Sequence, residues 1–211
     1  MRPGYRAIVT VLSAAGLVVA GCSGGTGKSP ATQSSAPPAS DSSPAAQNGA
    51  PKVQNPLPAK VLEGSPCDTS LSADDVKEFI GAPDPAKPDN SAALGASCSW
   101  HNAAGNGASI DVGYQTKLKG GLGAAYSNVK PDAVRWVEPS PIQGYPLVGY
   151  LSANSNGLEK SECVLVVGIS DDLTYSVGLF LSDSAKRKNI DPCTAGRDVA
   201  DRVLTRIKTR A

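Results

Sequence analysis

Five cysteines constrain this chain of 211 residues more tightly than any other feature of its sequence. One of them, Cys22, stands near the N-terminus, and the other four lie between residues 67 and 193. In an oxidising compartment, an even number of cysteines in one domain predicts a disulfide framework, and four cysteines allow three pairings. The compartment in which the chain folds therefore decides what these cysteines can do, and the N-terminal segment indicates that compartment.

The first 22 residues have the pattern of an export signal. Arg2 and Arg6 precede residues 7–20, a run of 14 mostly apolar residues. This run is shorter than the roughly 20 residues that a membrane-spanning helix needs, and it fits the hydrophobic region of a secretory signal. Small residues follow it, as a signal peptidase requires.

The run ends in Val19-Ala20-Gly21-Cys22. This tetrapeptide resembles the bacterial lipobox, with valine in place of the usual leucine. The resemblance implies that residues 1–21 are a lipoprotein signal peptide, and that Cys22 is the lipid attachment site, acylated with chains such as palmitate. Because two acyl chains give stable anchoring, we expect a protein bound to the extracytoplasmic face of the cell membrane. The alternative is an ordinary secretory signal followed by a cysteine that is there by chance.

Residues 22–60 have the composition of a disordered tether that follows the lipidated Cys22. Residues 23–60 include seven prolines, seven serines, seven alanines and four glycines, and Val53 and Leu57 are their only large apolar residues. Such a segment cannot bury enough apolar surface to offset the entropy lost on ordering. We expect a spacer between the membrane and the domain, and O-linked sugar on the segment is an alternative role.

Residues 61–211 are predicted to form a single disulfide-bonded α+β domain. Apolar periodicity and turn residues predict helices over 71–80, 124–129 and 191–208, and strands over 97–102, 108–115, 134–138, 145–152, 163–169 and 173–181. Residues 81–95, with three prolines, are interpreted as a loop. Short turns join most of the strands, which favours a mainly antiparallel sheet of five to six strands packed by the N- and C-terminal helices.

The four cysteines of this domain are predicted to form two disulfides. We favour Cys67–Cys98 and Cys163–Cys193, because each bond would tie the start of a helix to a strand that is near in sequence; the other two pairings stay open. A zinc site would need a Cys-X2-Cys knuckle, which the chain lacks, and no Cys-X-X-Cys redox motif is present. We therefore expect neither a metal nor a cofactor.

Four blocks of sequence resemble one known family. They are Pro66-Cys67-Asp68, Cys98-Ser99-Trp100, Cys163 at the head of an apolar strand, and Asp191-Pro192-Cys193. In this order and spacing, the blocks resemble the actinobacterial lipoproteins grouped as domain of unknown function 3558, over about residues 66–207. The resemblance implies no activity. It does imply a fold similar to the sandwiches of the Mog1 and PsbP type.

Charge and residue content narrow the possible functions. The formal net charge is +1, and it becomes −1 once Arg2 and Arg6 are removed, which gives no electrostatic basis for binding nucleic acid. His101 is the only histidine, so a Ser–His–Asp triad would have to use it, and no Gly-X-Ser-X-Gly motif is present. We predict no catalytic residue, and the sequence identifies no ligand-binding residue.

The sequence favours a non-catalytic binding module in the cell envelope, whose partner is a small apolar ligand, a glycan or an envelope protein. The site is expected in a cleft between sheet and helices or on residues 117–144. Two alternatives stay open: an envelope hydrolase with a scattered site built on His101, and an accessory subunit of an envelope complex, for which an exposed apolar patch is expected.

Overall fold

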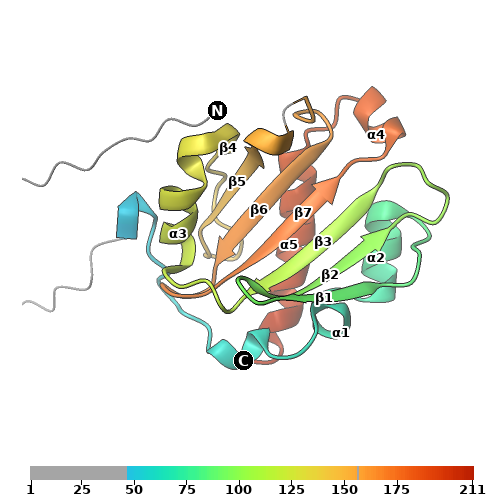
Figure 1. Cartoon of the computed structure of the whole chain (residues 1–211). Coiled ribbons are helices and arrows are strands. Elements are labelled where there is room, and N and C mark those ends of the chain that lie inside the picture. The colour runs from blue at the N-terminus through green and yellow to red at the C-terminus, as the bar shows by residue number, and fades with distance from the viewer. Residues whose placement is uncertain (1–46, 156) are drawn as a thin grey trace, which may run out of the picture. The chain divides into compact units, whose positions relative to one another are not determined.

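The computed structural model of the chain describes residues 47–155 and 157–211 (Figure 1). The predicted signal peptide, Cys22 and most of the predicted tether lie outside the described residues. The α-helices are α1 (Pro66–Thr69), α2 (Ala73–Ile80), α3 (Gly121–Asn128), α4 (Asp183–Arg187) and α5 (Pro192–Lys208). The strands are β1 (Lys87–Ser91), β2 (Gly95–His101), β3 (Ser109–Gln115), β4 (Ala133–Val137), β5 (Leu147–Ser152), β6 (Glu162–Gly168) and β7 (Thr174–Phe180). Short 3-10 turns lie at Gln47–Gly49, Ala59–Leu62, Lys130–Asp132 and Ala153–Ser155.

The helices that cover the sheet begin at residues suited to capping. Ser72 and Asp75 form a reciprocal capping box at the start of α2, and Asp191 caps α5, with Pro192 in its first turn. The predicted helix 71–80 thus begins two residues later, and a separate turn, α1, precedes it. No helix within the described ranges combines the length and the apolar character that a membrane span requires.

All seven strands belong to one sheet, in the order β1-β2-β3-β7-β6-β5-β4. Every neighbouring pair is antiparallel, as the turns between the strands predicted. The α+β class is confirmed, but the expected count of five to six strands is wrong. The additional strand is β1, which lies within the segment interpreted as a loop.

The sequence concealed β1 because it is an edge strand without an apolar face. Its residues, Lys-Pro-Asp-Asn-Ser, are nearly all exposed, so they show no alternation of apolar and polar side chains. A proline is tolerated there because an edge strand leaves part of its backbone unpaired. Pairing with β2, in the register Pro88↔Cys98, makes this segment a strand.

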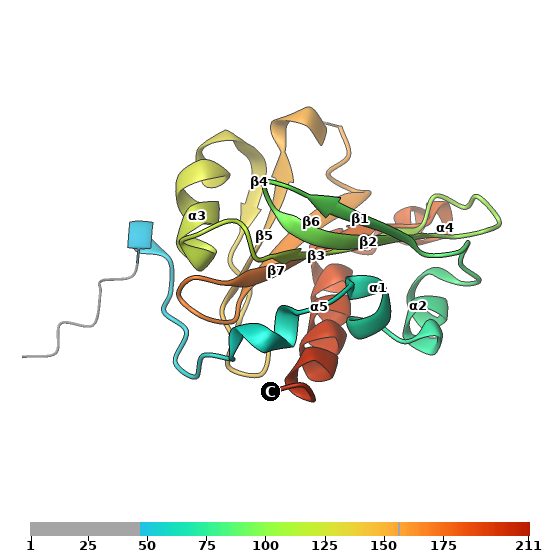
Figure 2. The same cartoon turned by 60° about the horizontal axis from the view of Figure 1, so that its bottom comes forward.

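One face of the sheet, here called the helix face, packs against α1, α2 and α5, whereas α3 lies on the opposite side (Figures 1 and 2). Ile110, Val112 and Tyr114 of β3 point to the helix face and are fully or almost fully buried. The apolar side of α5 packs on them and their neighbours through Val199, Val203, Leu204 and Ile207. This layer is the main hydrophobic core.

The approach of α5 to the sheet depends on a helical glycine. A Cβ atom at Gly196 would lie 2.8 Å from Cδ2 of Leu165 on β6. A larger residue there would push the helix away from the sheet. The hydroxyl of Tyr175 on β7 donates to the Ala200 carbonyl at 2.8 Å, so a buried polar group is also satisfied in this contact.

Two disulfides join helices to the sheet in the pairing favoured from sequence. Cys67 of α1 is bonded to Cys98 of β2, and Cys163 of β6 is bonded to Cys193 of α5. The sequence separations are 31 and 30 residues, so each bond closes a loop of moderate size. Both fix the first turn of a helix against the buried face of a strand.

Residues 47–60, assigned above to the tether, pack along the domain. Ala50 and Val53 are buried, and the Leu57 amide donates to the Ile169 carbonyl at 2.8 Å. The amide of Val53 also donates to the carboxylate of Asp171 at 3.3 Å. The domain therefore includes residues from 47 onward rather than from 61. The few apolar residues of this segment hold it in place.

Breaking either disulfide is predicted to destabilise the domain by about 3 kcal/mol, because each closes a loop of about 30 residues. The two matched double variants, Cys67→Ala with Cys98→Ala and Cys163→Ala with Cys193→Ala, are compared with the wild type by denaturant unfolding. The wild type is also unfolded with and without reductant. An equal free energy of unfolding with and without reductant would contradict the disulfide framework.

Candidate ligand groove on the open face of the sheet

The sheet face opposite α1, α2 and α5, here called the open face, is uncovered by any described helix over β1, β2, β3 and β7 (Figure 1). Side chains that point to this face alternate with the buried ones. On β2, β3 and β7 most of them are small or polar, among them Ser97, Ser99, Asp111, Gly113, Ser176 and Gly178, and Phe180 at the end of β7 is the large apolar exception. On β5 and β6 the corresponding residues are large, among them Val148, Tyr150, Val164 and Val166.

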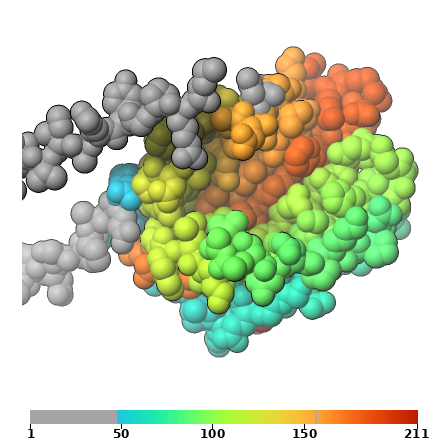
Figure 3. Space-filling view, viewed as in Figure 1, coloured from blue at the N-terminus to red at the C-terminus, as the bar shows by residue number. Residues whose placement is uncertain are grey.

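This difference in side-chain size hollows the open face, as the space-filling view shows along β6 and β7 (Figure 3). The resulting cavity, here called the sheet groove, has a volume of about 280 Å³ and extends from β1 to β6. Two glycines keep its floor low: Cβ atoms at Gly113 and Gly178 would lie 2.8 Å from Oγ of Ser176 and 3.4 Å from Cβ of Asp111, respectively. The groove is therefore a product of cross-strand pairing.

Three carboxylates line the sheet groove, those of Asp89, Asp111 and Glu162. Asp111 accepts a hydrogen bond from the hydroxyl of Ser99 on the neighbouring strand. The lining also includes four serines, Ser91, Ser97, Ser99 and Ser176, but no lysine, arginine or histidine. The groove is thus acidic and rich in hydroxyl groups.

Glu162 is the unusual member of this set. The residue is only 8% exposed, and its side-chain Oε2 has no hydrogen-bond partner among the described residues. Buried polar groups in folded proteins are nearly always hydrogen-bonded, because an unpaired buried carboxylate loses its hydration without compensation. A lining residue in this state indicates that the groove lacks a partner that a ligand could supply.

An aromatic cluster borders the groove on the side of α3. Tyr126 of α3 packs edge-on against Trp136 of β4, with ring centroids 5.2 Å apart, and Nζ of Lys130 lies 4.6 Å from the Tyr126 centroid. Burial and the nearby Glu138 carboxylate raise the pKa of Tyr126 to about 12. Tyr150 packs in this cluster and pairs across strands with Val164, which lines the groove. Burial and then the charge of Glu162 raise the pKa of Tyr150.

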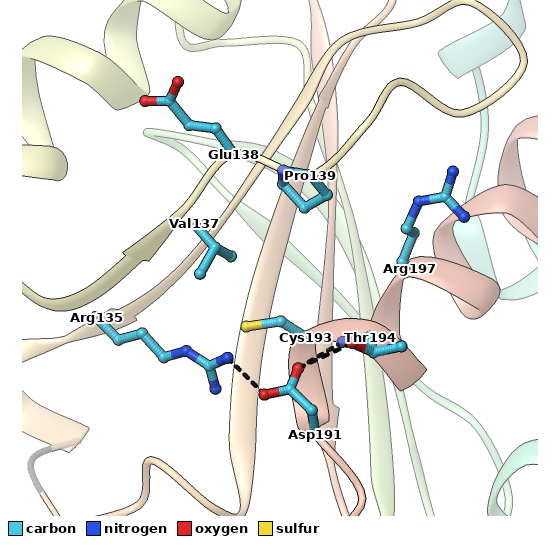
Figure 4. Close-up of a pocket in the computed structure, with 8 residues that line it drawn as sticks. All are labelled: Arg135, Val137, Glu138, Pro139, Asp191, Cys193, Thr194 and Arg197. Carbon is cyan, nitrogen blue, oxygen red and sulfur yellow. Dashed lines mark hydrogen bonds and ion pairs between the residues drawn. The ribbon is translucent and has the colours of Figure 1, made fainter.

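A second cavity, of about 310 Å³, lies beside the start of α5 (Figure 4). Its charged groups already have partners: Arg135 donates to Asp191, and Arg197 donates to the backbone carbonyls of Ser140 and Pro141. Burial alone would raise the pKa of Asp191, but hydrogen bonds from Arg135 and the Thr194 amide hold it below its usual value. The polar groups here are satisfied within the domain, so this cavity is the weaker candidate.

The residues singled out from sequence are not gathered at the sheet groove. Cys22 lies outside the described residues, and the other four cysteines form the two disulfides. His101 is exposed at the end of β2, and within residues 47–155 and 157–211 no hydrogen bond joins its ring to a serine or a carboxylate. The same residues contain no group of three or more potential metal ligands.

Sequence reasoning missed Asp111, Gly178 and Glu162 because they come from three strands. Alternation on β3 did indicate that Asp111 and Gly113 face away from the core. It could not indicate which strand lies next to β3, and hence which side chains share the open face with them. The expected site, a cleft between sheet and helices or residues 117–144, corresponds to the second cavity, between β4 and the start of α5, and not to the sheet groove.

Residues 17–206 match the family described as Protein of unknown function (DUF3558). Neither the curated proteins nor the solved structures contain a significant match to the chain.

Replacing the buried carboxylate is predicted to stabilise the empty protein. Glu162→Gln keeps the size of the side chain but removes the charge, so the free energy of unfolding should rise by about 1 kcal/mol. The control, Asp172→Asn, removes an exposed carboxylate at the opposite end of β6 and β7 and should change stability by less than about 0.5 kcal/mol. A loss of stability in Glu162→Gln would show that the carboxylate is satisfied within the domain.

Proposed function

Because this chain belongs to the DUF3558 family of proteins of unknown function, we propose its role from its own geometry: it is a non-catalytic module that binds a small ligand in the sheet groove. The observation that carries the proposal is the unpartnered, buried Glu162 in the wall of that groove. A protein that keeps such a group gives up stability, and binding is the common reason for doing so. The sequence named a small apolar ligand, a glycan or an envelope protein. A cavity of about 280 Å³ suits a small molecule, and its carboxylates and hydroxyls favour a polar molecule over the apolar one expected.

The location is part of the proposal. The lipobox-like end of the N-terminal segment, Val19-Ala20-Gly21-Cys22, supports acylation of Cys22 and anchoring on the extracytoplasmic face of the cell membrane. The residues after Cys22 would then place the groove within reach of envelope molecules. The disulfides are compatible with an oxidising compartment.

The fold type implied by the family resemblance also stays a proposal. A single antiparallel sheet with helices on both sides is compatible with a sandwich of the Mog1 and PsbP type. Proteins of this architecture need no catalytic residues in order to bind a ligand on the sheet, and fold by itself assigns no activity.

The accessory-subunit alternative would need an exposed apolar patch on the described surface. Four large apolar side chains are exposed, Leu94, Val134, Leu158 and Ile190. Leu94 follows the edge strand β1, whereas Val134 belongs to β4 at the other edge of the sheet. These two residues cannot share one continuous patch.

Substitution of Cys22 should abolish lipid attachment. In cells fed an alkyne analogue of palmitate, the wild type should carry the label, whereas Cys22→Ala should carry none and should accumulate as an uncleaved precursor. Ser23→Ala, a change at the neighbouring position, should label like the wild type. Label retained by Cys22→Ala would refute anchoring through this residue.

Filling the sheet groove should abolish ligand binding without unfolding the domain. Gly178→Leu projects a large side chain into the groove, and its Cβ would lie in ordinary contact with Asp111, at 3.4 Å. The wild type and the variant are purified from membranes in detergent, incubated with envelope extract and washed. Small molecules that stay bound are then identified by mass spectrometry.

The wild type should retain a small molecule that Gly178→Leu does not. An equally large side chain at the exposed Ser184, in Ser184→Leu, is the matched control and should bind as the wild type does. Circular dichroism checks that all three proteins are folded. Equal retention by the wild type and Gly178→Leu would place the binding site elsewhere.

A further inference from the structure

We propose that the sheet groove selects an organic cation, a small molecule whose protonated amine lies against the carboxylate of Glu162. This inference rests on the proposed function and adds the chemical class of the ligand. It follows from the charge of the groove, from the position of its carboxylates and from the groups between them.

The charges that line the groove are all of one sign. Asp89, Asp111 and Glu162 contribute three carboxylates, and no basic side chain lines the cavity. In a partly enclosed site, carboxylates attract a cation more strongly than they would in open solvent. An anionic ligand would meet the same groups with repulsion, so the lining discriminates by charge.

Glu162 supplies the position at which the cation is held. Its burial excludes most water, and Oε2 lacks a hydrogen-bond donor among the described residues. An ammonium group is a compact donor of three hydrogen bonds, and a charge-assisted bond to a carboxylate is among the stronger polar contacts. Such a ligand would satisfy a group that the described part of the chain leaves unpaired.

Asp111 offers a second carboxylate across the groove. It lies on β3, Glu162 lies on β6, and β7 runs between these strands. Since neighbouring strands are about 4.8 Å apart, the two residues are separated by on the order of 10 Å. A molecule with two amines joined by a short alkyl chain could place one charge near each carboxylate.

The floor between these carboxylates suits an alkyl chain with polar neighbours. Gly178 gives room, Val164 and Phe180 present apolar surface, and Ser176 adds a hydroxyl. A bare metal ion would not use this apolar surface. No cluster of three potential metal ligands occurs in the residues that the structure describes.

The test uses the full-length protein in detergent and three probes of equal chain length that differ in charge. They are 1,5-diaminopentane, 1,5-pentanediol and glutarate, each titrated by isothermal calorimetry. Each probe is measured against the wild type, Glu162→Gln, Gly178→Leu and Asp172→Asn, of which the last removes a carboxylate outside the groove. Titrations into detergent alone give the background.

The diamine should bind the wild type and Asp172→Asn with equal affinity. The diol and glutarate should give no heat above background with either protein. Glu162→Gln should weaken diamine binding about tenfold, because it removes a charge-assisted contact. Gly178→Leu should abolish it. Diamine binding that is absent, or is unchanged in Glu162→Gln, would overturn the inference.

Other outcomes separate this inference from the proposed function. If the diol or glutarate binds the wild type but not Gly178→Leu, the groove is a binding site for another class of ligand, so the inference fails and the proposed function stands. If no probe and no molecule from envelope extract distinguishes the wild type from Gly178→Leu, both fail.

Discussion

The contact between α5 and the helix face of the sheet is the interaction on which the rest of this structure depends. Val199, Val203 and Ile207 of α5 are fully buried against the sheet, and Gly196 lets the helix approach β6 closely. The Cys163–Cys193 bond fixes the first turn of the helix to the same strand. Burial of this apolar area is the main source of stability, and the disulfide limits the freedom of the unfolded chain.

Because helices cover one face of the sheet, the side chains on the other face need not be large and apolar. Since α1, α2 and α5 cover the helix face, the main core does not need large side chains on the open face of β2, β3 and β7. These strands carry serine and glycine there, whereas β5 and β6 carry large residues beneath α3. The sheet groove lies where the second apolar layer stops. Polar residues on that surface therefore do not weaken the main core. Glu162 differs from the others, because its carboxylate is buried.

Much of the fold could be predicted from sequence. The alternation of apolar and polar residues identified β3 and β7, and apolar residues at every fourth position identified α5. The strand β1 could not be found, since its polar residues become a strand only through pairing with β2. The packing of residues 47–60 was also missed. Two apolar residues, Val53 and Leu57, were too few to signal order, yet they are the residues that hold the segment on the domain.

The sequence by itself determined most of the elements, the side of the apolar strands that faces the core, and that four cysteines are available for two disulfides, of which it favoured the pairing between cysteines about 30 residues apart. These properties depend on local periodicity and on short loops. Only the tertiary structure decided that β7 lies between β3 and β6, and so brought Asp111, Gly178 and Glu162 to one surface. The order of strands depends on pairings between distant segments. A candidate site built across three strands therefore leaves no motif in the sequence.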